Sequence, residues 1–416
     1  MYSKLIKIIL PFFLSLNLYG ADYYWVGGTG NWSEFSTHWA TTSNGTTFHS
    51  NSPTLADDVF FDSNSGTSFN DTIFIDVNAI CNDIKVDGFN KIKQLANLSV
   101  FGTFNLVQGD FVSNGFNLSL NKFYSNYNFF RTFDITNTTL NLTGSDTVWT
   151  LEPTSFTFAQ TGSTINLSYA GNDMVTFSSG GNLITYENIN CIVNNLQLIE
   201  NSNFNNLTLI SGIHLYLPAL TTNGLPLTLM GNSINCTGNC TSPIIIEGIP
   251  INTASTQATL NMNSNVFNAD FTRFKNLIGA NGIFNATNSI DLGNNTGVTI
   301  TEDPSTAIAT WINGTGNWSD PAHWSTGCIP GPNNSVLFDA ASFSVTGQTV
   351  NVDVDAFCNN MTWTGVNNPI LIGNSNPIFL RGSMELDASM TTTFSEDFIF
   401  SSTIALIQTI QTSGVI

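Results

Sequence analysis

The sequence predicts an all-β solenoid, that is, a chain wound into stacked coils of short strands. Three observations support this prediction. Only 9% of the residues are charged, against roughly 25% in an ordinary soluble domain, and the polarity comes from Asn, Thr, Ser and Gly, which favour turns and strand faces over helix interiors. Short segments that alternate apolar and polar residues recur about every 8–12 residues. The pattern continues without a composition break that would mark separate sandwiches.

The first element is a predicted secretory signal peptide over residues 1–20. Lys4 and Lys7 precede an apolar run that ends at Leu18, and the small residue Gly20 follows, which is the order of such signals. The run is short for a transmembrane span, and no other segment is apolar enough. We therefore expect a secreted protein, at the cell surface or extracellular, with no transmembrane segment in the mature chain.

A tryptophan-rich motif then opens two repeats. WVGGTGNWSEFSTHW and WINGTGNWSDPAHW share a Gly-Thr-Gly-Asn turn, and their tryptophans are Trp25, Trp32, Trp39, Trp311, Trp318 and Trp324. The likeness extends beyond these motifs, for example from DDVFFDSNS to NSVLFDAAS. We predict a first module over residues 22–300, a linker over 301–310 and the start of a second, truncated module over 311–416.

Short alternating strands fill the first module. The clearest are Ile165–Leu167, Leu207–Leu209, Ile213–Leu217, Leu225–Leu229 and Leu260–Met262. Their spacing alone also allows a sandwich or a barrel. The unbroken run favours a solenoid, as does the abundance of Asn near strand ends, because stacked strands can form ladders of side-chain amides.

The six cysteines fit an oxidising compartment without forming a disulfide-dense scaffold. Cys236 and Cys240 flank a Thr-Gly-Asn turn that can bring them together, so they are the candidate disulfide. Cys81 and Cys358 occupy equivalent positions in the two repeats, whereas Cys328 has no counterpart in the first. We therefore expect Cys81 and Cys358 to be small buried residues.

Taken together, these motifs resemble the repeats of large exported, adhesin-like surface proteins of Bacteroidetes bacteria. The likeness rests on W-x-x-G-T-G-N-W-S with its His-Trp pair, on the following V-x-F-D and V-x-V-D-x-x-A-x-C segments, and on Phe271–Ile300. It implies a right-handed parallel β-helix with a Trp-rich N-terminal cap. It also implies a non-catalytic structural or binding protein that contacts a host or environmental surface, including its glycans.

The tryptophans allow two interpretations. They can pack as a cap over the end of a solenoid, since indoles bury large areas, or they can form a platform for sugar rings. Packing is favoured because a motif that recurs with each unit usually caps it. His38 and His323 lack a second His or Cys at ligand spacing, so we expect structural roles for both.

The acidic residues are the test for an enzyme. A glycosidase needs two carboxylates across a cleft, and the candidates are Asp57, Asp58, Asp62, Asp76, Asp339 and Asp353. They recur at strand ends, where turn capping is the usual role. A lyase acting on uronates also needs basic residues near its substrate, and Arg131, Arg273 and Arg381 are widely separated. We therefore expect no catalytic activity, with a carbohydrate-binding or carbohydrate-degrading β-helix as the alternative.

Cofactors and nucleic acid are not expected. The loop Asp62–Gly66 is acidic and ends in glycine, which leaves calcium as the one open cofactor, but the second repeat loses the pattern. The net charge of −19 argues against nucleic acid as a partner.

Overall fold

The computed structural model describes residues 20–66, 68, 70–220, 227–250, 256–402 and 407–415. Residues 1–19 of the predicted signal peptide and the beginning of the predicted strand Leu225–Leu229 lie outside this part. The chain forms two compact units, Met1–Thr138 with Thr154–Ala159, and Thr139–Pro153 with Gln160–Ile416. The first boundary between them falls inside the predicted first module. We describe each unit by itself.

The described residues form strands, turns and irregular segments with very little helix. Their helical elements are α1 Phe35–His38, η1 Gly181–Leu183 and η2 Pro321–His323. The strands of the first unit are β1 Asp22–Trp25, β2 Gly30–Asn31, β3 Trp39–Ala40, β4 Asp58–Phe61, β5 Thr72–Ile75, β6 Ala79–Cys81, β7 Ile84–Gln94, β8 Leu98–Val112, β9 Leu118–Ser125, β10 Arg131–Asp134 and β13 Phe156–Ala159.

The second unit holds two successive stacks of strands. Those of the first stack are β11 Thr139–Leu142, β12 Asp146–Leu151, β14 Thr164–Leu167, β15 Val175–Ser178, β16 Thr185–Cys191, β17 Asn195–Leu198, β18 Ser202–Leu209, β19 His214–Pro218, β20 Thr228–Thr237, β21 Ile244–Ile249, β22 Ala258–Asn261, β23 Val266–Asp270, β24 Thr272–Lys275, β25 Leu277–Ala280, β26 Ile283–Thr287, β27 Ile290–Asp291 and β28 Thr299–Ile300. Those of the second are β29 Ile308–Thr310, β30 Gly316–Asn317, β31 Ser335–Phe338, β32 Thr349–Asn351, β33 Ala356–Cys358, β34 Met361–Trp363, β35 Ile370–Ile372, β36 Ile378–Leu380, β37 Met384–Glu385, β38 Thr391–Thr392, β39 Phe398–Phe400 and β40 Ile410–Gln411.

Parallel pairing between coils builds the core of the first unit. In one row of partners, Val59 of β4 aligns with Ile84 of β7, which aligns with Phe104 of β8. All three side chains are buried. Because side chains alternate along a strand, each in-register row stacks like-facing residues, and the apolar ones meet inside.

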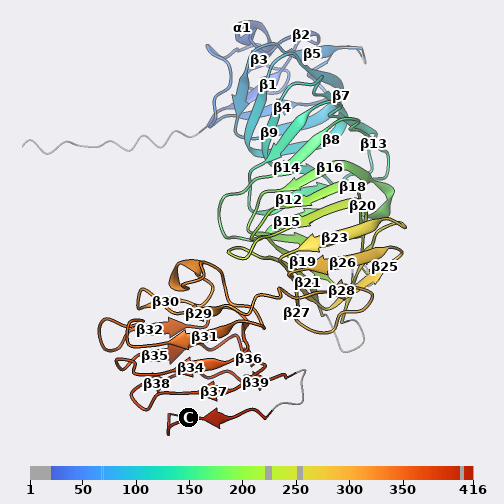
Figure 1. The fold of residues 1–416 in the computed structure, drawn as a ribbon. Coiled ribbons are helices and arrows are strands. Elements are labelled where there is room, and N and C mark those ends of the chain that lie inside the picture. The colour runs from blue at the N-terminus through green and yellow to red at the C-terminus, as the bar shows by residue number, and fades with distance from the viewer. Residues whose placement is uncertain are drawn as a thin grey trace, which may run out of the picture. The chain divides into compact units, whose positions relative to one another are not determined.

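The second unit repeats this arrangement and adds ladders of asparagine. Strands β16, β18 and β20 pair in parallel and lie one above another in Figure 1. On the neighbouring coils, Asn190 donates to Asn166 over 3.0 Å and Asn166 donates to Asn141 over 2.8 Å. A second ladder runs through Asn205 and Asn232. The amide ladders predicted from the sequence are therefore present.

The second stack shows the winding of the chain most simply. Its strands fall into three parallel sheets, β29-β31-β34-β37-β40, β30-β32-β35-β38 and β33-β36-β39. From β31 onward the chain visits the three sheets in turn and returns to the first one coil later (Figure 1). The prediction of an all-β, solenoid-like fold with parallel strands is thus confirmed. Strand β29 pairs with β31, so residues 308–310 of the predicted linker belong to a sheet.

Candidate functional site: two tryptophan caps and a disulfide

The first cap is a cluster of three buried indoles, those of Trp25, Trp32 and Trp39. Each is at most 1% exposed. Trp39 meets Trp25 edge to face at 4.9 Å and Trp32 at 4.8 Å between ring centres, a favourable geometry for aromatic pairs. The indole N–H of Trp25 donates to the carbonyl of Gly28, and that of Trp39 donates to the carbonyl of Trp32. The polar edges of both rings are therefore satisfied inside the cluster.

A histidine covers the outer face of this cluster. The ring of His38 lies parallel to Trp25, with 4.6 Å between ring centres. Its Nδ1 lies 2.6 Å from the carbonyl oxygen of Val26, and since a carbonyl only accepts, Nδ1 is the donor. A Cβ at Gly30 would lie 2.3 Å from Nε2 of the histidine. The second glycine of the Gly-Thr-Gly-Asn turn is therefore needed to make room for the histidine ring.

A serine and an aspartate tie the motif to the next coil. Asp76 accepts from the backbone N–H of Ser33 over 3.0 Å and from its hydroxyl over 2.6 Å. The two residues are 43 positions apart in sequence. The aspartate thus anchors the loop between Trp32 and Trp39 to the start of the stacked strands.

The second cap reproduces this arrangement. Trp311, Trp318 and Trp324 are at most 1% exposed, and Trp324 meets the other two edge to face at 5.0 Å and 4.8 Å. His323 stacks on Trp311 at 4.8 Å, and a Cβ at Gly316 would lie 2.1 Å from its Nε2. Two chain segments with different intervening residues therefore fold to the same local geometry.

The serine tie recurs as well. Asp353 accepts from the backbone N–H of Ser319 over 3.0 Å and from its hydroxyl over 2.5 Å. In both caps the indole faces are covered by neighbouring rings, so they are not open to stack on a sugar. This burial favours the packing interpretation, and the two histidines have the structural contacts expected of them.

The remaining candidate acids hold turns. Asp57 accepts from the N–H and hydroxyl of Thr54, and Asp58 accepts from the side chain of Asn82. Burial raises the pKa of Asp57, but the hydrogen bonds from Thr54 and from the backbone outweigh it, so the pKa is lowered overall.

Asp62 and Asp339 hold the same turn in the two repeats. Each accepts from the backbone N–H two positions ahead and from the hydroxyl of a serine, Ser65 or Ser342. These carboxylates are therefore engaged in the turn capping predicted from their positions. Among the described residues, no group of three or more His, Cys, Asp or Glu side chains is placed to hold a metal ion.

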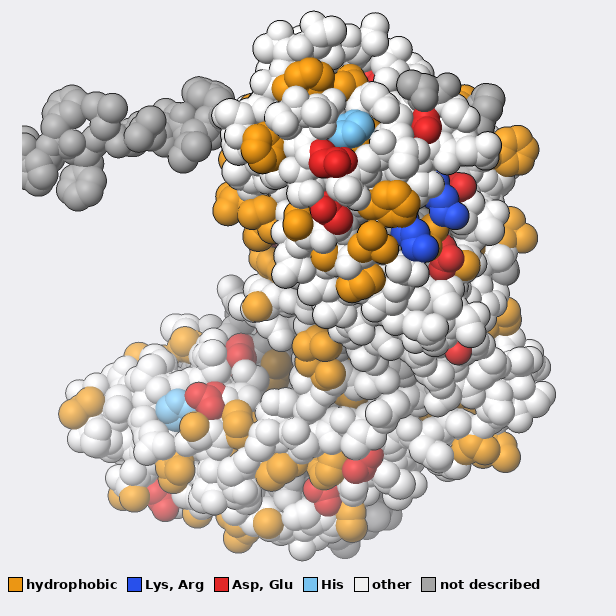
Figure 2. Space-filling view, turned by 90° about the horizontal axis from the view of Figure 1, so that it is seen from above, with side chains coloured by type: hydrophobic (Ala, Val, Ile, Leu, Met, Phe, Trp, Pro, Cys, Tyr) orange, Lys and Arg blue, Asp and Glu red, His pale blue; other side chains and the backbone are white. Residues whose placement is uncertain are grey.

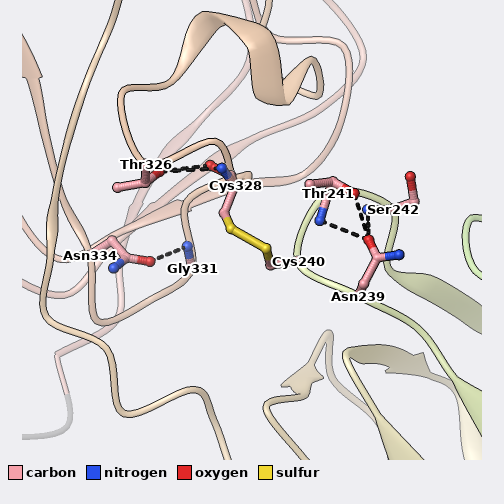
Figure 3. Close-up of a disulfide and its surroundings, with 8 residues drawn as sticks. All are labelled: Asn239, Cys240, Thr241, Ser242, Thr326, Cys328, Gly331 and Asn334. Atoms are coloured by element: carbon pink, nitrogen blue, oxygen red, sulfur yellow. Dashed lines mark hydrogen bonds between the residues drawn. A yellow bond between two sulfur atoms is a disulfide. The ribbon is translucent and has the colours of Figure 1, made fainter.

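The disulfide prediction is wrong in its pairing. Cys240 bonds to Cys328, 88 positions away (Figure 3), and Cys236 is a free, buried thiol. The reason is local geometry, because Cys236 faces inward from β20 in register with Leu209, whereas Cys240 lies in the turn beyond the strand. Alternation in the Ile234-Asn235-Cys236 segment is the sequence signal that places the Cys236 thiol inside.

The bonded loops are also held by polar contacts. Asn239 accepts from the backbone N–H groups of Thr241 and Ser242, and Asn334 accepts from the N–H of Gly331 (Figure 3). The N–H of Ile329 donates to the carbonyl of Cys240 over 3.2 Å. The prediction that Cys81 and Cys358 are buried free cysteines is confirmed, and burial raises the pKa of both thiols.

The chain matches no protein-family model, no curated protein and no solved structure. Within the described residues, none of the helices has the length and apolar character needed to cross a membrane.

Proposed function

We propose that the chain is an exported, non-catalytic structural and binding protein of a cell surface, built from repeated β-solenoid modules. The observation that carries this proposal is the close agreement between the two caps. The same indole cluster, stacked histidine and serine–aspartate hydrogen bonds occur in both caps. This repetition indicates that the chain is built from repeated modules. In a solenoid each coil needs its neighbours, and an end coil needs a cover.

The finer form of the proposal is a right-handed β-helix with a Trp-rich cap at the start of each module. Right-handed crossovers join parallel strands in about 98% of cases, which favours this hand. The likeness to adhesin-like repeats of Bacteroidetes supports a surface-bound, adhesive role.

The chemistry of the side chains supports a non-catalytic role. The acids singled out in the sequence accept hydrogen bonds from backbone, hydroxyl and side-chain amide donors, as Ser33–Asp76, Ser319–Asp353 and Asn82–Asp58 illustrate. On the face seen in Figure 2, charged side chains are sparse, and the Lys and Arg side chains lie beside acidic ones. Such a surface suits contact with neutral partners, including glycans, better than electrostatic capture of an ion or nucleic acid.

The test begins with export of the full chain from a Bacteroidetes host. We expect a mature protein that lacks the first ~20 residues and is removed from intact cells by added protease. Leu14→Asp, which places a charge in the apolar run, is the control that should stay inside. Retention of Met1 on a surface-exposed protein would contradict the predicted signal peptide.

Adhesion is then measured with beads that carry the purified chain, on immobilised glycans and on extracellular matrix. We expect retention of the beads without any change in the glycans. Cleavage of a polysaccharide that disappears in Asp76→Asn but persists in a variant at an unrelated exposed acid, Asp173→Asn, would favour the enzymatic alternative.

A further inference from the structure

The three arginines of the chain differ in how their charges are satisfied. Arg131 is buried and donates through Nε to the Ser125 hydroxyl over 2.6 Å and through Nη1 to two backbone carbonyls. Arg381 forms an ion pair with Glu302 and also donates to Asn333. Both therefore have the partners that a buried or half-buried guanidinium requires.

Among the residues that the structure describes, Arg273 has no comparable set of partners. It is 5% exposed, and its Nε is buried without a hydrogen-bond acceptor. Its one side-chain hydrogen bond to the described residues runs from Nη1 to the backbone carbonyl of Asp355 at 3.5 Å, a long contact for such a bond. The guanidinium also lies 5.8 Å from the ring centre of Phe357. A buried donor without an acceptor is costly, so this site is an exception that needs a cause.

The position of Arg273 in its strand explains how it became buried. Thr272 and Phe274 of β24 are fully buried in the core of the coil, so alternation directs Arg273 outward. It is covered by the segment that contains Asp355 and Phe357. Burial lowers the pKa of Arg273 to about 10, against the opposing effect of Asp355, so the side chain stays charged at neutral pH.

Arg273 lines a pocket of about 330 Å³ beside the Cys240–Cys328 disulfide. Its apolar wall is formed by Pro243, Phe271, Ile290, Ala307, Ile329 and Pro332. This volume lies at the lower end of the range for small-molecule sites, which are mostly apolar with a few polar groups that fix the ligand.

One acidic side chain also lines the pocket. Asp303 is half-buried and accepts from the backbone N–H of Ser305. Its charge disfavours a ligand with several negative groups. The apolar wall, the single under-bonded cation and this carboxylate together select a ligand with one negative charge on an apolar body.

We propose that this pocket binds a compact monocarboxylate, whose carboxylate accepts hydrogen bonds from Arg273 and whose apolar body packs against Phe271 and Ile290. Guanidinium and carboxylate match as a two-pronged pair. The proposal does not depend on the export or adhesion of the chain, because it concerns a site within one compact unit.

The test uses the full mature chain with its disulfide intact. The probes are benzoate and 4-methylpentanoate, each compared with its neutral amide by calorimetry and by the shift in melting temperature. We expect the carboxylates to bind at least about tenfold more tightly than the amides, as the loss of a charge-assisted hydrogen bond implies. Equal binding of acids and amides, or no binding of either, would refute the proposal.

Matched variants locate the effect. Arg273→Met should abolish the preference for the acid without lowering the melting temperature of the free protein, because it removes an under-bonded buried charge. Lys275→Met, on the same outer face of β24, should bind benzoate as the parent does. If Arg273→Met instead melts well below the parent, the arginine is structural and the proposal fails.

A conservative change keeps the test open if the methionine variant does not fold. Arg273→Lys retains the charge but loses the planar, two-pronged donor. It should weaken benzoate binding several-fold while the amide is unaffected. Unchanged benzoate affinity in this variant would show that the carboxylate does not reach position 273.

Discussion

Replacement of Trp32 by alanine is the sharpest test of the cap. The indole is 1% exposed and lies between Trp39 and Phe61, at 4.8 and 6.4 Å between ring centres. The hydrogen bond from Trp39 goes to the backbone carbonyl of residue 32, so the alanine variant keeps it and loses packing alone. Truncation of a large buried aromatic costs about 3–5 kcal/mol.

The loss of stability in Trp32→Ala should be confined to the coils near the first cap, because each coil is stabilised by its neighbours. Hydrogen exchange of the full chain should show faster exchange in β1–β5 of Trp32→Ala, while the second cap around Trp318 stays protected. Trp318→Ala should give the reverse pattern. Phe130→Ala is the matched control, because this ring is 83% exposed and its removal should change little.

The reasoning fails if Trp32→Ala unfolds at the same denaturant concentration as the parent. Such a result would mean that the indole is not part of a cooperative core. If the same variant also lost binding to glycans, the sugar-platform interpretation would replace packing.

The remaining predictions concern a glycine, a carboxylate and the disulfide. Gly30→Ala should destabilise the first cap, because its Cβ would overlap the His38 ring, and a second change, His38→Ala, should recover part of the loss in thermal melts. The hydrogen bond from His214, with help from Lys275, lowers the pKa of Glu247 against the effect of burial. The stabilisation from ionised Glu247 is therefore complete above its unfolded pKa of about 4.3 and is lost as the pH falls through its lower pKa in the folded state. Acid unfolding curves of Glu247→Gln should not show this loss. Cys328→Ser should lower stability by about 2–4 kcal/mol. Added reductant should destabilise the parent but not the variant, which lacks the Cys240–Cys328 bond, whereas equal melting of parent and variant under oxidising conditions would contradict a stabilising disulfide.

Much of the fold was predictable because its signals are local. Strand alternation of period two identified β14 and β19, and the repeated motif located both caps. The asparagine ladder through Asn141 and Asn166 followed from parallel stacking, which places equivalent residues over one another. These features depend on neighbouring residues or on one repeat length, both of which are visible in the chain.

The missed features depend on contacts between distant segments. The partner of Cys240 lies 88 positions away, and no local pattern connects the two residues. The alternation of side chains along β24 predicts that Arg273 is exposed. It is buried because residues near Phe357 cover it. Residues 308–310 of the predicted linker form β29 for a similar reason, since this strand pairs with β31.

The low charge of the chain follows from how parallel coils stack. In-register pairing places equivalent positions on adjacent strands about 4.8 Å apart, so a charge repeated in every coil would stack on its own sign. An amide can both donate and accept, so a column of asparagines satisfies itself. Two aligned pairs carry opposite charges, Lys91 with Asp110 and Glu247 with Lys275, whereas Asp22 aligns with Asp58.

Arg273 differs from the paired charges, because it has no charged partner in its ladder. Its register partners on the adjacent strands are Ile245 and Ile290, so neither register partner carries an opposite charge. A structural arginine in this fold is expected to have carbonyl acceptors, as Arg131 has, or a carboxylate, as Arg381 has. Arg273 has apolar ladder partners, an Nε without an acceptor among the described residues, and a pocket at its side. These three observations are the physical basis for our proposal that a ligand carboxylate supplies the missing acceptor.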